Sequence, residues 1–231
     1  MHYLLVKTGI DFRLYKKNTL IRRLIKRIQV TNFTNLTNYF SYLVSKKNEI
    51  HILCREFLIG VTQFFRDKEA FDHLEATILP RIFARSEHEE IRVWCTGCST
   101  GEEAYSLAML FLDYREKLGV NRPIKIFASD VNAEAIRKAS IGKYGPNIVA
   151  DISLERLERY FIKGPNYYEV KKEPRNVIVF ARHNVLKDPP FINLDLVTCR
   201  NMLIYLDNEV QKTFIEKVQY SLRPKGFLML G

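Results

Sequence analysis

The first 60 residues carry apolar positions at helical spacing. Five of these positions between residues 20 and 28 cover an arc of about 140° at about 100° per residue, which predicts an amphipathic helix. Four cationic residues fall on the opposite arc of the same helix. The apolar set is Leu20, Ile21, Leu24, Ile25 and Ile28, and the cationic set is Arg22, Arg23, Lys26 and Arg27.

Two further helices are expected in this part of the chain. Thr34 can cap a helix that runs through Leu43, and a third helix covers roughly 49–59, with Gly60 as its stop. These patterns predict an all-α N-terminal domain at 1–66. A linker helix is then expected over 67–88, with Asp67 as its N-cap.

From residue 89 onward, short apolar runs alternate with helical patterns. Such alternation predicts an α/β fold, a doubly wound and mostly parallel sheet that is covered on both faces. Ligands of these sheets bind beyond the carboxyl ends of the strands. The expected strands lie at 91–94, 124–128, 176–180, 194–198 and, near the end of the chain, 226–230. The expected helices between them lie at 101–117, 133–140 and 207–222, with Asn132 and Asp207 as caps of the last two.

Composition adds one strong asymmetry to this picture. The 231 residues are 47% hydrophobic and 27% charged, which is typical of globular proteins. Residues 1–48 hold ten Lys or Arg and one Asp, so they carry +9 of the net charge of +10. A basic module of this kind fits a nucleic acid, an anionic membrane surface or an acidic protein.

Targeting and cysteine patterns favour a cytoplasmic protein. No apolar run approaches the ~20 residues of a membrane span, and the N-terminus does not read as a secretion signal. The four cysteines are too few for a disulfide scaffold. Cys95 and Cys98 form one CxxC pair with no second pair to complete a zinc set, so no metal is expected.

The turns after the first two strands carry the candidate chemistry. Small residues from Thr96 to Gly101 would let the backbone approach a ligand closely. Glu102 and Glu103 at the following helix start would repel a pyrophosphate and would suit an ammonium or sulfonium group. Asp130 ends the second strand, where an acidic residue binds ribose hydroxyls. S-adenosylmethionine therefore fits this turn better than NAD does.

Four segments in order resemble one protein family. They are Thr62–Arg66 (TQFFR), Ser99–Ser106 (STGEEAYS), Ala128–Val131 (ASDV) and Cys199–Tyr205 (CRNMLIY). These segments are similar to motifs of the CheR family, the chemotaxis receptor glutamate methyltransferases, and the similarity spans nearly the whole chain. The resemblance implies a Rossmann-like S-adenosylmethionine-dependent methyltransferase domain at 89–231, with a small antiparallel β insertion at about 158–176.

The same resemblance implies a reaction and a partner. A methyl group would pass to glutamate side chains on the cytoplasmic helices of a methyl-accepting chemotaxis receptor, which gives glutamyl methyl esters and S-adenosylhomocysteine in adaptation signalling. The basic helix would lie along such an acidic helix. The insertion looks about three residues shorter than in members that dock on a receptor tail peptide, so no tail tether is expected. A monomer without bound nucleic acid or membrane insertion is also expected.

Site residues follow from the matched motifs. The resemblance implies catalytic roles for Arg66 and Tyr205, while Glu102 is a weaker candidate than Glu103 for the cofactor's ammonium group. The implied cofactor-binding set is Thr62, Arg66, Glu103, Asp130, Asn184, Val185, Arg200 and Asn201. The implied partner-binding set is Arg22, Arg23, Lys26 and Arg27.

Departures from the family pattern leave alternatives open. Gly60 stands where members commonly have Asn, and the chain stops at Gly231 before a G-H-S-E segment, so we expect a C-terminally incomplete domain. Residues 188–191 (DPPF) resemble the motif of amino-group methyltransferases, but they precede the fourth strand and are interpreted as a turn. The alternatives are a non-catalytic module that binds cofactor or receptor, a nucleic-acid methyltransferase and an NAD-dependent dehydrogenase.

Overall fold

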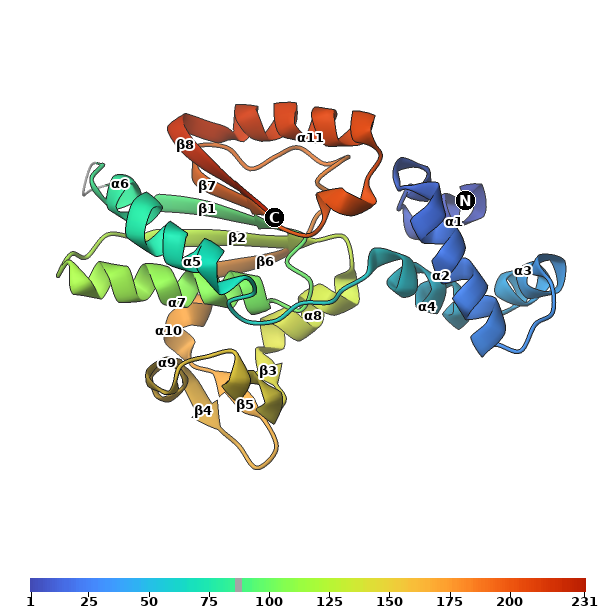
Figure 1. Cartoon of the computed structure of the whole chain (residues 1–231), viewed down its shortest axis with the longest axis horizontal. Helices are drawn as coiled ribbons and strands as arrows, with labels where there is room; N and C mark the ends of the chain where they lie inside the picture. Colours follow the sequence, from blue (N-terminus) through green and yellow to red (C-terminus); the bar gives the residue numbers. More distant parts are fainter. Residues whose placement is uncertain (86–88) are drawn as a thin grey trace. The chain divides into compact units, whose positions relative to one another are not determined.

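The computed structural model describes residues 1–85 and 89–231 and divides the chain into two compact units (Figure 1). The first unit comprises Met1–Gly60 and Met202–Phe214, and the second comprises Val61–Asn201 and Ile215–Gly231. The apolar pattern gave no sign that residues 202–214 belong with the N-terminal helices. Among the described residues, no helix combines the length and the apolar character needed to cross a membrane.

The first unit is helical, and three of its helices pack against the fourth. Its centre is formed by aromatic and aliphatic side chains, among them Phe12, Leu53 and Phe57, which are almost fully buried. The returning segment is joined through the backbone, because the Lys16 N–H donates to the Tyr205 carbonyl at 2.9 Å. The elements are α1 (His2–Thr8), η1 (Phe12–Leu14), α2 (Lys17–Val30), α3 (Leu36–Ser45), α4 (Lys47–Leu58), η4 (Leu203–Tyr205) and the start of α11 (Asn208–Ser221).

Two helix boundaries differ from the sequence prediction. The N-cap of α3 is Asn35 rather than Thr34, because the Asn35 side chain accepts the Asn38 N–H at 2.9 Å. Helix α4 ends one residue before Ile59, which adopts a left-handed conformation with φ 42°, so the stop precedes Gly60. Because a β-branched residue rarely adopts that conformation, the preference for glycine at helix ends predicted a stop one residue too late.

Helix α2 is rotated relative to the arc that its sequence suggests. Ile21 and Ile25 are 52% and 51% exposed, although they lie on the apolar arc. Arg27, predicted on the solvent arc for partner binding, is instead only 14% exposed. Its guanidinium pairs with Glu49 at 2.7 Å and with Glu56 at 3.3 Å. The expectation of a free, partner-facing Arg27 is therefore wrong, because the acids of α4 hold this side chain inside the unit.

Glu49 explains why Arg27 turns inward. Burial disfavours the ionised form of Glu49, but hydrogen bonds from Arg27 and Tyr39 outweigh this cost and lower its pKa. A buried carboxylate without such a cation would carry a large desolvation penalty. The amphipathic pattern alone could not reveal this, because the partner lies 22 residues away.

The second unit is built on a five-stranded sheet in which every neighbouring pair is parallel. Its order is β6-β2-β1-β7-β8, so the chain steps outward in one direction from β1 and in the other from β7. In doubly wound sheets such a reversal, here at the carboxyl ends of β1 and β7, is the place where ligands bind. The strands are β1 (Ile91–Thr96), β2 (Ile124–Asp130), β6 (Ile178–Arg182), β7 (Leu194–Cys199) and β8 (Leu222–Leu230).

Both faces of this sheet are covered. One face packs against α7 (Glu102–Lys117) and the linker helix, whose segments are α5 (Lys68–His73), the π-helical η2 (Leu74–Ile78) and α6 (Leu79–Phe83). On strands β1 and β2, Trp94 and Phe127 are packed by Phe191, whose ring stacks on Phe127 at 4.6 Å. Figure 1 shows α11 alongside β7 and β8.

A small antiparallel sheet completes the second unit. Its order is β3-β5-β4, and β3 comes from residues 143–144, before the predicted insertion at 158–176. The Tyr160 hydroxyl donates to Asp113 at 2.6 Å and ties the insertion to helix α7. The predicted α/β class with an all-α module and a β insertion is confirmed. The elements here are α8 (Ala133–Ile141), β3 (Lys143–Tyr144), η3 (Pro146–Ala150), α9 (Leu154–Tyr160), β4 (Phe161–Lys163), β5 (Tyr168–Val170) and α10 (Lys172–Asn176).

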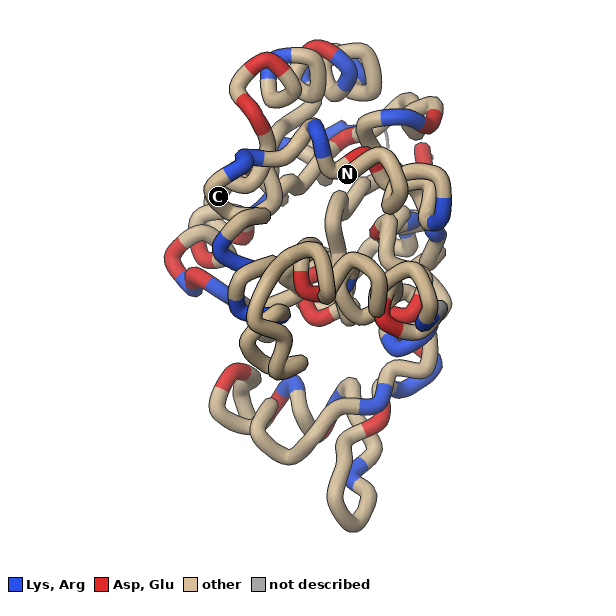
Figure 2. Tube along the Cα trace, turned by 90° about the vertical axis from the view of Figure 1, so that its right-hand side faces the viewer, with Lys and Arg blue, Asp and Glu red and all other residues tan. Residues whose placement is uncertain are grey.

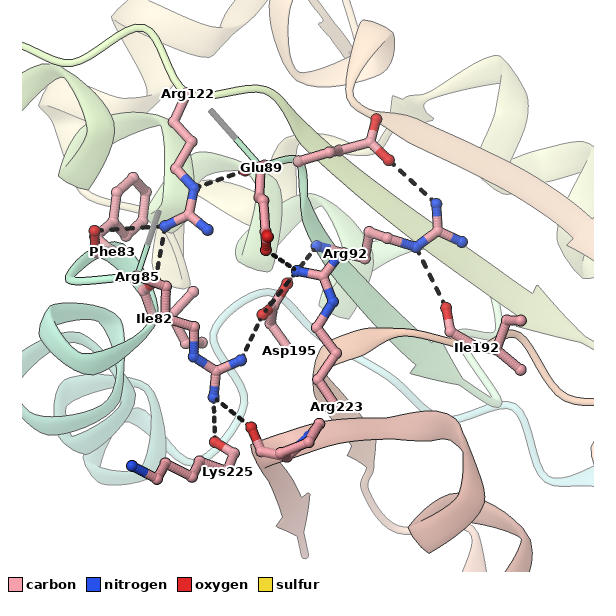
Figure 3. Close-up of polar contacts among 12 residues, drawn as sticks. Ile82, Phe83, Arg85, Glu89, Arg92, Arg122, Ile192, Asp195, Arg223 and Lys225 are labelled. Carbon is pink, nitrogen blue, oxygen red and sulfur yellow. Dashed lines mark hydrogen bonds and ion pairs between the residues drawn. The ribbon is translucent and has the colours of Figure 1, made fainter. Parts of the chain in front are cut away.

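An ion cluster fastens the amino end of the sheet (Figure 3). Asp195 at the start of β7 is fully buried and pairs with Arg85 at 2.7 Å and Arg223 at 3.5 Å. Its second oxygen accepts the Arg92 N–H of β1 at 2.9 Å. Arg85 also donates to the Lys225 carbonyl of β8. One carboxylate thus joins the end of the linker helix to three strands.

Candidate functional site

The turn after β1 is shaped by left-handed backbone conformations at Gly97 (φ 65°), Ser99 (φ 49°) and Gly101 (φ 99°). A Cβ at Gly101 would lie 2.8 Å from the Ala139 Cβ, so only glycine fits between the turn and α8. The Cys98 N–H donates to the Ser129 carbonyl at 2.9 Å, which holds the turn against the end of β2.

Asp130 lies where β2 ends, and backbone donors fix its carboxylate. One oxygen accepts the Ser99 N–H at 2.9 Å and the other accepts the Asn132 N–H at 2.8 Å. Burial raises the pKa of Asp130, while these backbone hydrogen bonds act in the opposite direction. The remaining lone pairs of this oriented carboxylate can accept from a vicinal diol such as a ribose.

Glu103 connects α7 to the neighbouring strands. Its Oε1 accepts from the Thr198 hydroxyl at 2.6 Å and from the Cys95 thiol at 3.5 Å. Burial raises the pKa of Glu103, and the Thr198 hydrogen bond and the positive charges of Arg200 and Arg66 partly offset this rise. The half-buried carboxylate of Glu103 therefore lies within the electrostatic influence of two guanidinium groups.

Glu102 has a different environment from Glu103. Both of its oxygens accept from the neighbouring Thr100 hydroxyl, at 2.9 and 2.7 Å. Burial raises its pKa as well. Its partner comes from its own turn, whereas the partners of Glu103 come from β1 and β7, which leaves Glu103 as the carboxylate nearer the strand ends.

The raised pKa of Glu103 gives a pH prediction. A carboxyl group whose pKa is higher in the folded state stabilises the fold below its unfolded pKa and loses that contribution as the pH rises through the folded value. Glu103→Gln removes this contribution, so in urea unfolding the wild type should gain stability relative to the variant as the pH falls from neutral toward the ordinary glutamate pKa of about 4.3. Glu69→Gln, an exposed change on α5, is the control. Equal pH slopes for wild type and Glu103→Gln would contradict the assignment.

Arg200 follows β7 and is the most enclosed cation of the site. Its side chain is 2% exposed, its Nη2 pairs with Asp67 at 2.6 Å, and its guanidinium lies over the Phe71 ring at 5.2 Å. Its Nε finds no hydrogen-bond partner among the described residues. The next residue, Asn201, is left-handed (φ 55°) and donates its N–H to the Gly231 carbonyl at 2.8 Å.

Two of the predicted residues precede the linker helix. Thr62 is half-buried, and Arg66 is half-buried with its Nη1 donating to the Val61 carbonyl at 3.1 Å. The two phenylalanines between them anchor this segment, because Phe64 and Phe65 belong to or pack against the main core. The motif therefore combines an anchored centre with polar residues at both ends.

Asn184 and Val185 lie in a turn after β6 that is closed by its own side chains. Asp188 accepts the Asn184 N–H at 2.8 Å, and Asn184 accepts the Leu186 N–H at 3.1 Å. Asp188 therefore serves the turn, as the interpretation of residues 188–191 requires. Lys217 of α11, which sequence reasoning missed, donates to the Val185 carbonyl at 2.9 Å. No motif marks it, because its role depends on the packing of α11.

Not every predicted residue falls in the same unit. The second unit gathers Glu103 with the charges of Arg66 and Arg200, and Asp130 ends the strand next to β1. Tyr205 belongs to the first unit, where it ends the 3-10 turn η4. Sequence reasoning also missed Asp67 as a partner of Arg200, since its place before a helix suggested only a cap.

A cavity of ≈ 470 Å³ opens elsewhere in the second unit, between the linker helix and α9. Phe65, Phe71, Leu110 and Arg156 are among its lining residues. Its lining includes none of the predicted cofactor-binding residues. Its lining does include Asp67, the partner of Arg200.

The hydrogen-bonding groups at the strand ends fit S-adenosylmethionine. The fixed carboxylate of Asp130 could accept from ribose hydroxyls, and the half-buried carboxylate of Glu103 could accept from an ammonium group. The unpartnered Nε of Arg200 is a donor that a ligand acceptor can satisfy. The strand order and these groups define a Rossmann-like S-adenosylmethionine-dependent methyltransferase domain.

Comparison with protein families agrees with this class. Residues 60–231 match the family model described as CheR methyltransferase, SAM binding domain, and residues 1–58 match CheR methyltransferase, all-alpha domain. The chain therefore belongs to the CheR methyltransferase family, and the cofactor of its larger domain is S-adenosylmethionine.

Individual relatives differ in how much of their length is matched. The chain is 44% identical over 223 residues to an "Uncharacterized 104.1 kDa protein in hypE 3'region" of Rhodobacter capsulatus, covering 96% of this chain but 23% of that protein. It is 33% identical to a chemotaxis protein methyltransferase of Listeria monocytogenes, covering 96% and 83%. The corresponding Escherichia coli protein is 31% identical, with 97% and 79% covered.

Proposed function

We propose that this chain transfers a methyl group from S-adenosylmethionine to glutamate side chains of a chemotaxis receptor in adaptation signalling. Several relatives that match most of the chain are named chemotaxis protein methyltransferases. The observation that carries the proposal is the set of polar groups at the ends of parallel strands, where backbone N–H groups fix the Asp130 carboxylate, Thr198 holds Glu103, and the buried Arg200 has an unpartnered Nε. Such a site can hold a zwitterionic amino-acid tail and a second carboxylate.

The proposed chemistry needs little proton transfer. S-adenosylmethionine supplies an electrophilic methyl group on a sulfonium sulfur. A glutamate carboxylate, ionised at neutral pH because its ordinary pKa is about 4.3, attacks the methyl carbon. The new O–C bond forms as the C–S bond breaks, and the electron pair of the broken bond stays on sulfur. The protein therefore acts mainly by alignment, and a general base is unnecessary.

Each site residue has a proposed task. Arg66, with Thr62, binds a carboxylate, either that of the cofactor or that of the incoming glutamate, since a guanidinium fork matches a carboxylate. Asp130 holds the ribose and Glu103 the ammonium group. The remaining residues have two tasks, with Asn184 and Val185 flanking the adenine and Arg200 and Asn201 lining the pocket near the transferred methyl.

The exposed face of α2 is the proposed receptor contact. Arg22 and Lys26 are exposed and Arg23 is half-buried, whereas Arg27 is held by Glu49. Ile21 and Ile25 are exposed on the same helix, so the surface offers both cations and apolar contacts. Figure 2 shows the charged positions along the chain trace. A glutamate-rich amphipathic helix is complementary to this surface.

A methylation assay tests the proposal together with its docking surface. The chain is incubated with labelled S-adenosylmethionine and a soluble receptor cytoplasmic fragment, and base-labile methyl ester is counted. Replacing Arg22, Arg23 and Lys26 together by Gln should raise KM for the fragment about tenfold at low salt, because charged side chains steer encounter, while cofactor affinity stays unchanged.

The matched control replaces three exposed lysines of the second unit, Lys163, Lys172 and Lys187, by Gln. This control removes the same charge from the chain and should leave KM nearly unchanged. An unaltered KM and salt dependence in the α2 variant would exclude the docking surface. Cofactor binding without any ester formation would instead favour a non-catalytic module.

A further inference from the structure

Asp67 occupies a position that its local structure does not explain. It immediately precedes α5 and has a left-handed backbone with φ 56°, which is uncommon for a residue other than glycine. Among the described residues its carboxylate caps no N–H of α5. The side chain instead reaches Arg200, which is 133 positions away in the sequence. Its conformation therefore serves a tertiary contact.

The two partners of this ion pair differ strongly in solvent exposure. The Arg200 side chain is 2% exposed, whereas the Asp67 side chain is 60% exposed, and their charged atoms are 2.6 Å apart. A buried guanidinium needs a nearby negative charge, since its desolvation is costly. Asp67 supplies that charge from the more exposed end of the pair, and the positive charge of Arg200 also acts on Glu103.

Charge balance matters here because the two forms of the cofactor differ in charge. S-adenosylmethionine carries a sulfonium, an ammonium and a carboxylate, with net charge +1. S-adenosylhomocysteine has lost the sulfonium charge and is neutral overall. An uncompensated Arg200 would therefore penalise the methyl donor more than the product, and the penalty is large where water is excluded.

We propose that Asp67 is a positioning residue that orients the Arg200 guanidinium and neutralises it, so that the pocket accepts a cationic methyl donor. The inference rests on the proposed function, which places Arg200 in the cofactor pocket. Asp67 itself touches no reacting atom in this scheme. It acts through Arg200, whose remaining N–H groups stay available to the pocket.

Titration calorimetry on the whole chain without receptor tests the inference through a ratio of affinities. Asp67→Asn should weaken the binding of S-adenosylmethionine about three- to tenfold more than the binding of S-adenosylhomocysteine. The difference should be larger at low salt. Asp67→Glu should restore the wild-type ratio. Asp72→Asn is the matched control, because it removes a carboxylate of α5 that forms no ion pair among the described residues. This variant should leave the ratio unchanged.

A double variant keeps the test decisive if Asp67→Asn unfolds. Asp67→Asn combined with Arg200→Gln removes both charges of the pair, so it should fold and return the affinity ratio to the wild-type value. A wild-type ratio in Asp67→Asn, or an equal change in Asp72→Asn, would overturn the inference while the proposed function stands. Wild-type protein that binds neither compound would overturn both.

A second readout needs no ligand. The Arg200 Nε–H group is buried, so it should give a resolved nuclear magnetic resonance signal, assigned by its loss in Arg200→Lys. Asp67→Asn should shift or broaden this signal because the guanidinium loses its anchor, and Asp72→Asn should not. An unmoved signal in Asp67→Asn would show that Asp67 does not orient Arg200.

Discussion

Asp130→Ala should reduce the affinity for S-adenosylhomocysteine about 100-fold or more, because hydrogen bonds to a charged group contribute about 1.5–3 kcal/mol each and a ribose diol makes two. The same change also releases the N–H groups of Ser99 and Asn132, which now end on this carboxylate. Titration calorimetry on the purified chain measures the effect directly. Asp130→Asn, which keeps one acceptor oxygen, should lose less affinity than the alanine variant.

The matched control for Asp130 is Asn132→Ala. Asn132 caps α8 by accepting the N–H groups of Glu134 and Ala135, so its removal disturbs the same turn but leaves the carboxylate in place. Thermal unfolding of both variants separates binding from stability. If Asn132→Ala lost as much affinity as Asp130→Ala, the carboxylate would not be the ribose ligand.

Asp195→Ala should be the most damaging single change to the stability of the second unit. Its removal strands Arg85 and Arg223 beside each other and leaves the Arg92 N–H without its acceptor (Figure 3). Breaking a buried ion pair from one side costs about 3–5 kcal/mol. Urea unfolding followed by fluorescence reports on this unit, because Trp94 of β1 is the only tryptophan and is fully buried.

Glu90→Ala provides the contrast for Asp195. Glu90 pairs with Arg92 at 3.1 Å at the same end of the sheet, but its side chain is 36% exposed. Exposed pairs contribute about 0–1 kcal/mol, so this variant should shift the urea midpoint only slightly. Similar shifts for the two variants would mean that the Asp195 cluster is no more than a surface ion network.

The sequence predicted the type and order of the main elements from local patterns, although the start of α3 and the end of α4 each differ by one residue. The alternation of apolar runs and helical segments predicted all five parallel strands, and Asn132 caps α8 as expected. Small residues in the turn at Gly101 were expected to let a ligand approach, and the structure adds a second reason, the close passage of Gly101 to Ala139 of α8. The strands and the Asn132 cap depend on neighbours within a few residues, so periodicity and capping preferences predict them, whereas the contact of Gly101 with Ala139 requires the fold.

The sequence was a poor guide wherever a charged side chain finds a distant partner. Arg27 looked like a solvent-facing cation until Glu49 and Glu56 of another helix were seen to hold it. Asp67 looked like a helix cap, but it pairs with Arg200 across the fold. Helical periodicity predicts the direction of a side chain, but it does not predict which charged groups of other elements lie in that direction.

The return of residues 202–214 to the first unit limits how this protein can be dissected. The Asp207 N–H donates to the Leu14 carbonyl at 3.1 Å, and Tyr15 forms an isolated bridge with Leu206. A truncation after Gly60 would leave these backbone groups without their hydrogen-bond partners in both fragments. Chimaeras that exchange the basic module between relatives should therefore transplant the 202–214 stretch along with it.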